Sequence, residues 1–272
     1  MTVFCCIHFY RNEKGIAVKI YIFADMEGIS GIANSTFVTA DGSQYAAGRK
    51  YLTRDVNICA QACFDAGADE VVIRDGHGGG VSILWSELIP GVKLIQGGTP
   101  GQRFFDIEGS DGIILLGYHA MAGTQRALME HTYSSKSIQN IWMNGVRAGE
   151  FAIDTAIAGE YGVPVIMTSG CDKLCAEARK FLPQVVTCQV KRSITCQSAM
   201  LLAPAEAEQL LRKQTVSAIE KLKNGDMKPY KNPETVTIRT EYIERCEPVL
   251  GLVADRTVER SGTSIEKVFL GL

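Results

Sequence analysis

The chain has 272 residues, which is enough for one large domain or two smaller ones whose core needs no disulfide bonds. Its 28 Lys and Arg residues nearly balance its 30 Asp and Glu residues, and the formal net charge of −2 favours neither a nucleic-acid partner nor a membrane surface. No apolar run reaches the roughly 18 residues that a membrane span needs. We therefore expect a soluble globular protein with no nucleic-acid or membrane partner.

The nine cysteines indicate reduced thiols and not a disulfide framework. Their number is odd, and most of them lie inside apolar runs. This usage is typical of a cytoplasmic protein. The pairs Cys59/Cys63 and Cys171/Cys175 also have a spacing that would suit a zinc knuckle. One apolar helix face explains each pair at least as well, and we adopt that interpretation.

Residues 1–17 lack the features of an export signal. The start MTVFCCIHFY has no basic region and no small-residue cleavage site. The first clear strand begins near Val18. We expect residues 1–17 to be a disordered extension, or upstream translation from a misassigned start.

From Val18 to about Asp172, short apolar runs alternate with helical patterns. The expected strands are 18–24, 70–74, 92–95, 112–117, 138–143 and 163–168, and the expected helices are 43–66 and 150–161. The first helix stops at Gly67, a typical C-terminal glycine. This alternation predicts an α/β fold, a three-layer sandwich with a largely parallel sheet covered by helices on both faces.

The pattern changes after about Pro183. A strand at 185–190 leads to a helix at 204–222, a polar linker at 223–234 and a strand at 235–242. We expect an α/β metal-binding catalytic domain over 18–184 and a smaller α+β domain over 185–272.

Acidic and imidazole side chains follow three of the expected strands. Ligands collect beyond the carboxyl ends of the strands in open parallel sheets, where the loops converge. The candidates at this edge are Asp25, Glu27, His77 and His119, with Glu150 at the start of a helix and His131 in the segment between. They include three of the four histidines of the chain.

Carboxylates and imidazoles in this number favour one or two ions such as zinc, and such a pair of ions can activate a water molecule. Each residue alone has a plainer interpretation. An Asp-x-Glu sequence is usually solvated, a buried histidine is often a hydrogen-bonded core residue, and an acidic residue in a first helical turn, such as Glu150, interacts well with the helix dipole. The coincidence of the whole set favours a metal site.

The glycine-rich run at Gly76–Gly80 has a competing interpretation as an anion-binding loop. It lacks the Lys-Ser/Thr of a P-loop and does not match GxGxxG. We expect its glycines to let the backbone turn so that His77 points inward. The chain has no GxSxG elbow and no recognisable cysteine nucleophile signature, which argues against serine and cysteine hydrolases.

Seven motifs follow one another along the chain. They are Ala24-Asp25-Met26-Glu27-Gly28, Leu52-Thr53-Arg54-Asp55-Val56-Asn57, Asp75-Gly76-His77-Gly78, Gly117-Tyr118-His119-Ala120-Met121-Ala122-Gly123-Thr124, His131-Thr132, Asn144-Gly145 through Gly149-Glu150, and Gly162-Val163-Pro164-Val165. In order and spacing they resemble the M55 metallopeptidases, the DppA-like D-aminopeptidases. The resemblance covers residues 18–272 and is most specific over 24–172.

The resemblance implies two zinc ions per subunit, held by Asp25, Glu27, His77, His119 and Glu150 with the aspartate bridging, and a catalytic role for His131. It also implies release of N-terminal residues, preferably D-amino acids, from short peptides, and a homo-oligomeric ring, which by the resemblance is a decamer. Two departures stand out: Gly170-Cys171-Asp172 replaces the common Gly-Asp-Asp, and Asp154 replaces the usual asparagine.

Other functions use similar residues. A dinuclear phosphoesterase or another amidohydrolase would need much the same ligands, although no basic phosphate clamp lies near these motifs. A non-catalytic peptide-binding component of a transport system would bind peptides without turnover. A nucleotide-binding Rossmann module is disfavoured because Asp25 and Glu27 occupy the turn that its glycine fingerprint needs. The part played by His131 stays open between nucleophile, acid or base, and oxyanion donor.

Overall fold

The structure is a computed structural model that describes residues 17–99, 101–243, 252–253 and 256–272. The expected extension therefore lies outside the described residues, except for Ala17. None of the described helices is long and apolar enough to cross a membrane.

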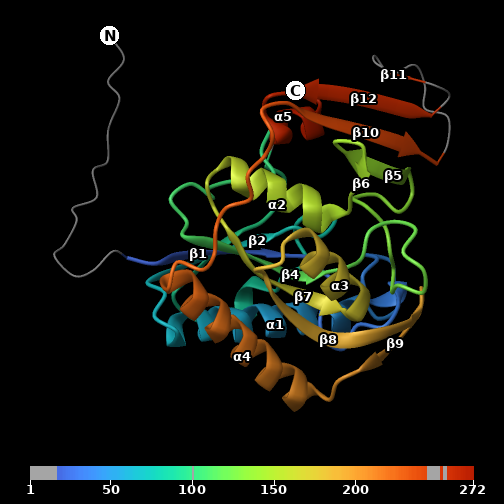
Figure 1. The fold of residues 1–272 in the computed structure, drawn as a ribbon. Helices are drawn as coiled ribbons and strands as arrows, with labels where there is room; N and C mark the ends of the chain where they lie inside the picture. The colour runs from blue at the N-terminus through green and yellow to red at the C-terminus, as the bar shows by residue number, and fades with distance from the viewer. Residues whose placement is uncertain (1–16, 100, 244–251, 254–255) are drawn as a thin grey trace, which may run out of the picture.

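A seven-stranded sheet forms the centre of the molecule (Figure 1). Its order is β3-β2-β1-β4-β7-β8-β9, and every neighbouring pair is parallel except β8 with β9. The strands are β1 (Lys19–Ala24), β2 (Glu70–Asp75), β3 (Val92–Ile95), β4 (Gly112–Tyr118), β7 (Val165–Cys171), β8 (Val186–Thr195) and β9 (Ser198–Leu201). The largely parallel α/β sheet expected from the sequence is confirmed.

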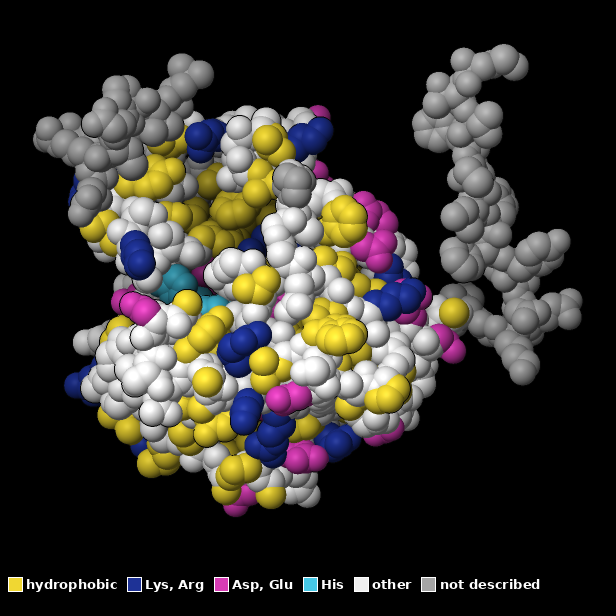
Figure 2. Space-filling view, turned by 180° about the vertical axis from the view of Figure 1, so that it is seen from behind, with side chains coloured by type: hydrophobic (Ala, Val, Ile, Leu, Met, Phe, Trp, Pro, Cys, Tyr) yellow, Lys and Arg dark blue, Asp and Glu magenta, His cyan; other side chains and the backbone are white. Residues whose placement is uncertain are grey.

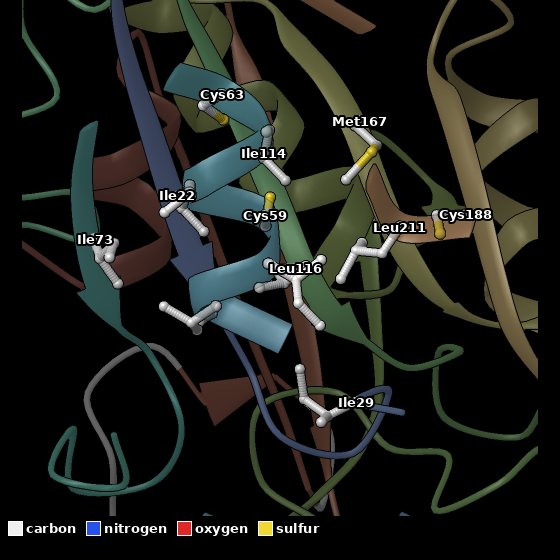
Figure 3. Packing of buried hydrophobic residues seen from close by; sticks show 14 of the residues in the cluster. Ile22, Ile29, Cys59, Cys63, Ile73, Ile114, Leu116, Met167, Cys188 and Leu211 are labelled. Carbon is white, nitrogen blue, oxygen red and sulfur yellow. The ribbon is translucent and has the colours of Figure 1, made fainter. Parts of the chain in front are cut away.

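Helices cover both faces of this sheet. α1 (Tyr45–Asp65) and α4 (Pro204–Lys223) pack together on one face, where Figure 3 shows the core they bury. Cys59 and Cys63 lie in this core, as an apolar helix face requires. α1 ends at Asp65 with Ala66 as its C-cap, and the residue after the cap, Gly67, has a φ of 85°, which glycine adopts without strain.

The opposite face carries α2 (Glu150–Glu160) and α3 (Asp172–Phe181). Beyond α2 lies a second, antiparallel sheet of five strands in the order β11-β12-β10-β5-β6 (Figure 1). Its strands are β11 (Leu252–Val253), β12 (Thr257–Gly262), β10 (Val236–Tyr242), β5 (Ile138–Met143) and β6 (Val146–Arg147), and α5 (Ile265–Leu270) packs against β10, β12 and α2. The first nine residues of α2 are all buried, because apolar side chains of both sheets share one core with it.

The chain enters the second sheet twice, with β5 and β6 and again with β10 to β12. β8 and β9 belong instead to the seven-stranded sheet, and α4 packs on that sheet. Each sheet therefore contains strands from both sides of the expected domain boundary between residues 184 and 185. The division into a domain over 18–184 and a second domain over 185–272 stays a prediction.

Candidate metal centre

Two strand ends meet closely at one edge of the large sheet. Asp25 directly follows β1, and His119 directly follows β4. Between them the backbones touch: a Cβ atom on Gly28 would lie 2.0 Å from the carbonyl oxygen of Tyr118, and one on Gly117, whose φ is 75°, would lie 2.3 Å from the carbonyl oxygen of Asp25. Only glycine permits this approach, which brings Asp25 and His119 to one place.

His77 reaches the same place from the end of β2. Its Nδ1 atom lies 3.0 Å from Asp25 Oδ1 and 3.2 Å from Glu27 Oε2. On the other side of the ring, Nε2 donates a hydrogen bond of 2.8 Å to the carbonyl oxygen of Val38. Because Nε2 carries the proton of this hydrogen bond, Nδ1 has a free lone pair when the ring is neutral. That lone pair is directed at the two carboxylates.

The glycine-rich run after β2 turns as expected. Gly78 and Gly80 have φ angles of 52° and 69°. A Cβ atom on Gly76 would lie 2.1 Å from the ring of Phe23. The turn therefore depends on glycine, and it carries His77 to the cluster.

His119, His131 and Glu150 form the other half of the site. His119 Nε2 lies 3.2 Å from Glu150 Oε1 and 3.5 Å from Asp25 Oδ2. The rings of His119 and His131 are stacked, with centroids 3.9 Å apart, and His131 Nε2 lies 3.7 Å from Glu150 Oε1. Glu150 is held at the start of α2 by a hydrogen bond of 2.7 Å from the backbone N–H of Tyr133.

All six residues expected at the site therefore come together. We call them the carboxylate–histidine cluster: Asp25, Glu27, His77, His119, His131 and Glu150. Two overlapping groups within it have the geometry of a metal site, one made of Asp25, Glu27 and His119 and the other of His119, His131 and Glu150. Asp25 links the halves, because one carboxylate oxygen faces His77 and the other faces His119.

The carboxylates give the cluster a strong affinity for cations. Burial lowers the pKa of His77, but the charges of Glu27 and Asp25 outweigh it and raise the pKa to about 12. Burial likewise lowers the pKa of His119, and Glu150 more than reverses the effect. Glu27 and Glu150 respond in the opposite sense, since the nearby histidines hold their pKa values low despite burial. Protons and metal ions would compete for these atoms.

Two buried polar atoms of the cluster, Glu27 Oε2 and His119 Nε2, make no well-aligned hydrogen bond to any residue that the structure describes. Each lies 3.2 Å from an oppositely charged group, Glu27 Oε2 from His77 and His119 Nε2 from Glu150. Leaving such atoms unpaired in the interior is unfavourable. Nitrogen and oxygen donors that converge without satisfying one another fit a zinc-type ion.

The cluster opens into a cleft of about 560 Å³. In Figure 2 histidine side chains are visible inside a recess of the surface. The cleft is bordered by η1 (Ser35–Phe37) and the two residues that follow it, by residues 129–136, and by the turn between β8 and β9. A small molecule can therefore reach the cluster from solvent.

An arginine–aspartate pair lies beside the cluster, and no local sequence pattern indicated it. Arg103 lines the cleft and donates two hydrogen bonds to the buried carboxylate of Asp154, at 3.0 and 2.9 Å. The two residues are far apart in the chain, and Arg103 lies in an irregular segment between β3 and β4. The sequence signal is Asp154 itself, which the resemblance to the M55 family marks as a departure from asparagine.

Lys191 is a second residue that sequence reasoning missed. It is 2% exposed, and its ammonium donates hydrogen bonds to the carbonyl oxygens of Glu27 and Ile32, at 2.9 and 2.7 Å. Burial lowers its pKa to about 7. Lys191 therefore holds the loop that carries Asp25 and Glu27 against β8.

Comparisons with known proteins agree on one family. The sequence profile of the M55 peptidases, described as D-aminopeptidase, matches residues 18–269. A D-aminopeptidase of Bacillus subtilis (strain 168) is 34% identical over 230 residues, which cover 83% of this chain and 81% of that protein. The solved structure of the zinc-dependent D-aminopeptidase DppA from Bacillus subtilis, a self-compartmentalizing protease, superposes with a TM-score of 0.86 at 29% identity, covering 93% of this chain and 94% of that one.

Proposed function

Because the chain belongs to the M55 family of D-aminopeptidases, we propose that it is a zinc-dependent aminopeptidase that releases N-terminal amino acids, preferably of D configuration, from short peptides. The observation that carries the proposal is the placement of Asp25, whose two carboxylate oxygens face different imidazoles in an open cleft. A carboxylate that faces two nitrogen ligands in this way is suited to bridge a pair of ions.

We assign five residues as ligands of two zinc ions: Asp25, Glu27, His77, His119 and Glu150. The unpartnered atoms Glu27 Oε2 and His119 Nε2 support this assignment, as does the hydrogen bond that leaves Nδ1 of His77 facing the carboxylates. When bound, the ions would polarise the scissile carbonyl group and lower the pKa of an attacking water molecule.

His131 is assigned the catalytic proton transfer. Its Nδ1 atom is engaged by the carbonyl oxygen of Met129 at 2.9 Å, so Nε2 is the atom available to a substrate in the cleft. In hydrolysis, water adds to the peptide carbonyl carbon, the C–N bond breaks, and the leaving amine takes up a proton. His131 Nε2 can deliver that proton or hydrogen-bond the developing oxyanion.

The assembly state is proposed by analogy with a related structure. DppA of Bacillus subtilis is described as self-compartmentalizing, and we propose that this chain also forms a homo-oligomeric ring, a decamer as the family resemblance implies. Light scattering on the purified protein measures the subunit number. We also propose a cytoplasmic location, which the five free cysteines buried in the described part of the chain support.

One assay tests the proposed function. The purified protein is analysed for bound metal and is given D-Ala-D-Ala and L-Ala-L-Ala before and after treatment with a chelator. We expect about two zinc ions per chain, faster cleavage of the D-peptide, and loss of activity on chelation. Bound metal without cleavage of either peptide would overturn the peptidase assignment and point to phosphoesters or other amides.

A further inference from the structure

The guanidinium of Arg103 is fixed in place beside the carboxylate–histidine cluster. Nε and Nη2 each donate a hydrogen bond to Asp154, which is completely buried. Asp154 also accepts hydrogen bonds from the hydroxyls of Tyr118 and Tyr133, at 2.6 and 3.0 Å. A forked ion pair anchored in this way has one orientation.

Two aromatic rings pack against the same guanidinium and limit its movement. Its central carbon lies 4.4 Å from the ring centroid of Phe23 and 5.0 Å from that of Tyr133. Burial lowers the pKa of Arg103, but Asp154 outweighs this and raises the pKa well above its usual value. Arg103 is therefore a permanent cation whose position is set by packing.

Part of this cation remains available to a ligand. Nη1 donates no hydrogen bond to any residue that the structure describes, yet the side chain is 18% exposed and lines the cleft. Nη2 lies 3.8 Å from Glu150 Oε2, which puts the guanidinium next to the proposed zinc ligands. Asp154 balances the charge of Arg103 but leaves the two N–H groups of Nη1 without an acceptor among the described residues.

The short distance between Arg103 and the cluster limits which part of a substrate the guanidinium can bind. One residue of extended peptide spans at most about 3.6 Å. If the scissile carbonyl of a dipeptide lies at the cluster, its terminal carboxylate lies within one residue length of that point, in the range of Arg103. Lys136 lines the same cleft and adds positive charge there.

We propose that Arg103, positioned by Asp154, binds the free C-terminal carboxylate of a dipeptide substrate and makes the enzyme selective for free dipeptides. This inference rests on the proposed peptidase function. It assigns Arg103 to substrate binding, and it makes Asp154 a positioning residue.

The first experiment compares two substrates that differ only in this carboxylate, D-Ala-D-Ala and its C-terminal amide. With the wild-type protein we expect kcat/KM to be about 10- to 100-fold higher for the free acid, as loss of a charge-assisted hydrogen bond predicts. Equal cleavage of both would overturn the inference and leave the proposed function standing. Cleavage of neither would overturn the proposed function, and the inference with it.

The second experiment removes the cation. Arg103→Met alone leaves a buried charge on Asp154 and can unfold the protein, so it is combined with Asp154→Asn, which still accepts a hydrogen bond from a tyrosine hydroxyl. We expect the preference for the free acid to disappear in the double variant. The acid-to-amide ratio of kcat/KM should fall to about 1, while bound zinc and the thermal unfolding temperature should match those of the wild type.

A purely structural role gives a different pattern. If Arg103 only orients Glu150, the double variant loses activity on the acid and the amide alike, which would overturn the inference. Arg103→Lys keeps the charge without the fork and should retain part of the preference. Arg54→Met is the matched control, because Arg54 forms its ion pair with Glu208 away from the cleft and should leave the acid-to-amide ratio unchanged.

Discussion

The ammonium of Lys191 donates a hydrogen bond of 2.9 Å to the backbone carbonyl of Glu27 and so joins β8 to the loop that follows β1. A second bond of 2.7 Å reaches the carbonyl of Ile32 at the far end of the same loop. A buried lysine is thus used as a backbone clamp beneath the proposed zinc ligands.

Replacing this clamp should destabilise the fold. Lys191→Met keeps the aliphatic length but leaves two buried carbonyl oxygens without donors, and we expect the free energy of unfolding to decrease by about 2–4 kcal/mol. Urea denaturation of the metal-free protein measures the change. The control is Lys93→Met, which removes an exposed ion pair with Glu70 and should cost less than about 1 kcal/mol. Equal midpoints for Lys191→Met and the wild type would contradict the clamp.

The contact between Gly28 and Tyr118 predicts a second effect. Gly28→Ala would place a methyl group 2.0 Å from a backbone oxygen, and the ends of β1 and β4 would have to separate. We expect a loss of about 1–3 kcal/mol in stability and much weaker zinc binding, because Asp25 and His119 move apart. Metal analysis after dialysis and thermal unfolding check both effects. Gly79→Ala is the control, since no atom lies within 4 Å of its added Cβ.

The sequence predicted the cluster because its residues follow apolar strands. Runs such as Gly112–Tyr118 are buried along their whole length, so their carboxyl ends could be placed at one edge of a parallel sheet, and His119 with them. Asp25 and His77 could be placed at the same edge because each follows an apolar strand of its own, whereas their direct contact depends on the pairing of β1 with β2. The apolar runs are local patterns that depend little on distant partners.

Other features depend on pairings that no local pattern specifies. Lys191 is charged, and its burial depends on α4 and on the loop after β1, which pack against β8 from distant parts of the chain. The pairing of β5 with β10 joins residues about a hundred positions apart, so the composition of the second sheet could not be read from chain order. The spacing of Cys171 and Cys175 was explained by one apolar helix face, but Cys171 is the last residue of β7 and only Cys175 lies in α3, so that interpretation was wrong for this pair.

The place of His131 predicts separate effects on turnover and on metal content. Because we assign it to proton transfer, His131→Ala should lower kcat by about 10²- to 10⁴-fold while bound zinc stays at the wild-type level. Asp25→Asn, at the proposed bridge, should lose zinc and activity together. Measuring both bound metal and steady-state kinetics distinguishes the two variants. Since His131 lies 3.7 Å from Glu150, loss of zinc in His131→Ala would instead make it a ligand.

Glu177 of α3 predicts a pH effect on stability. Its Oε2 atom accepts a hydrogen bond of 2.9 Å from the backbone N–H of Met121, whereas Oε1 is buried without a partner. Burial raises its pKa from 4.5 to about 7. Between these two values the folded protein keeps a proton that the unfolded chain has released, so rising pH favours unfolding. This destabilisation is absent below pH 4.5 and is complete above pH 7.

Glu177→Gln imitates the protonated carboxyl group and removes this penalty. Relative to the wild type, the variant should be more stable by about 3 kcal/mol at pH 8 and by less than about 1 kcal/mol at pH 5. Urea denaturation at both pH values measures the difference, and taking it between variant and wild type cancels groups that titrate in both proteins. Glu220→Gln, at an exposed position of α4, should change stability by less than about 0.5 kcal/mol at either pH. A Glu177→Gln effect of the same size at pH 5 and pH 8 would show that hydrogen bonding, and not the charge of Glu177, determines its contribution.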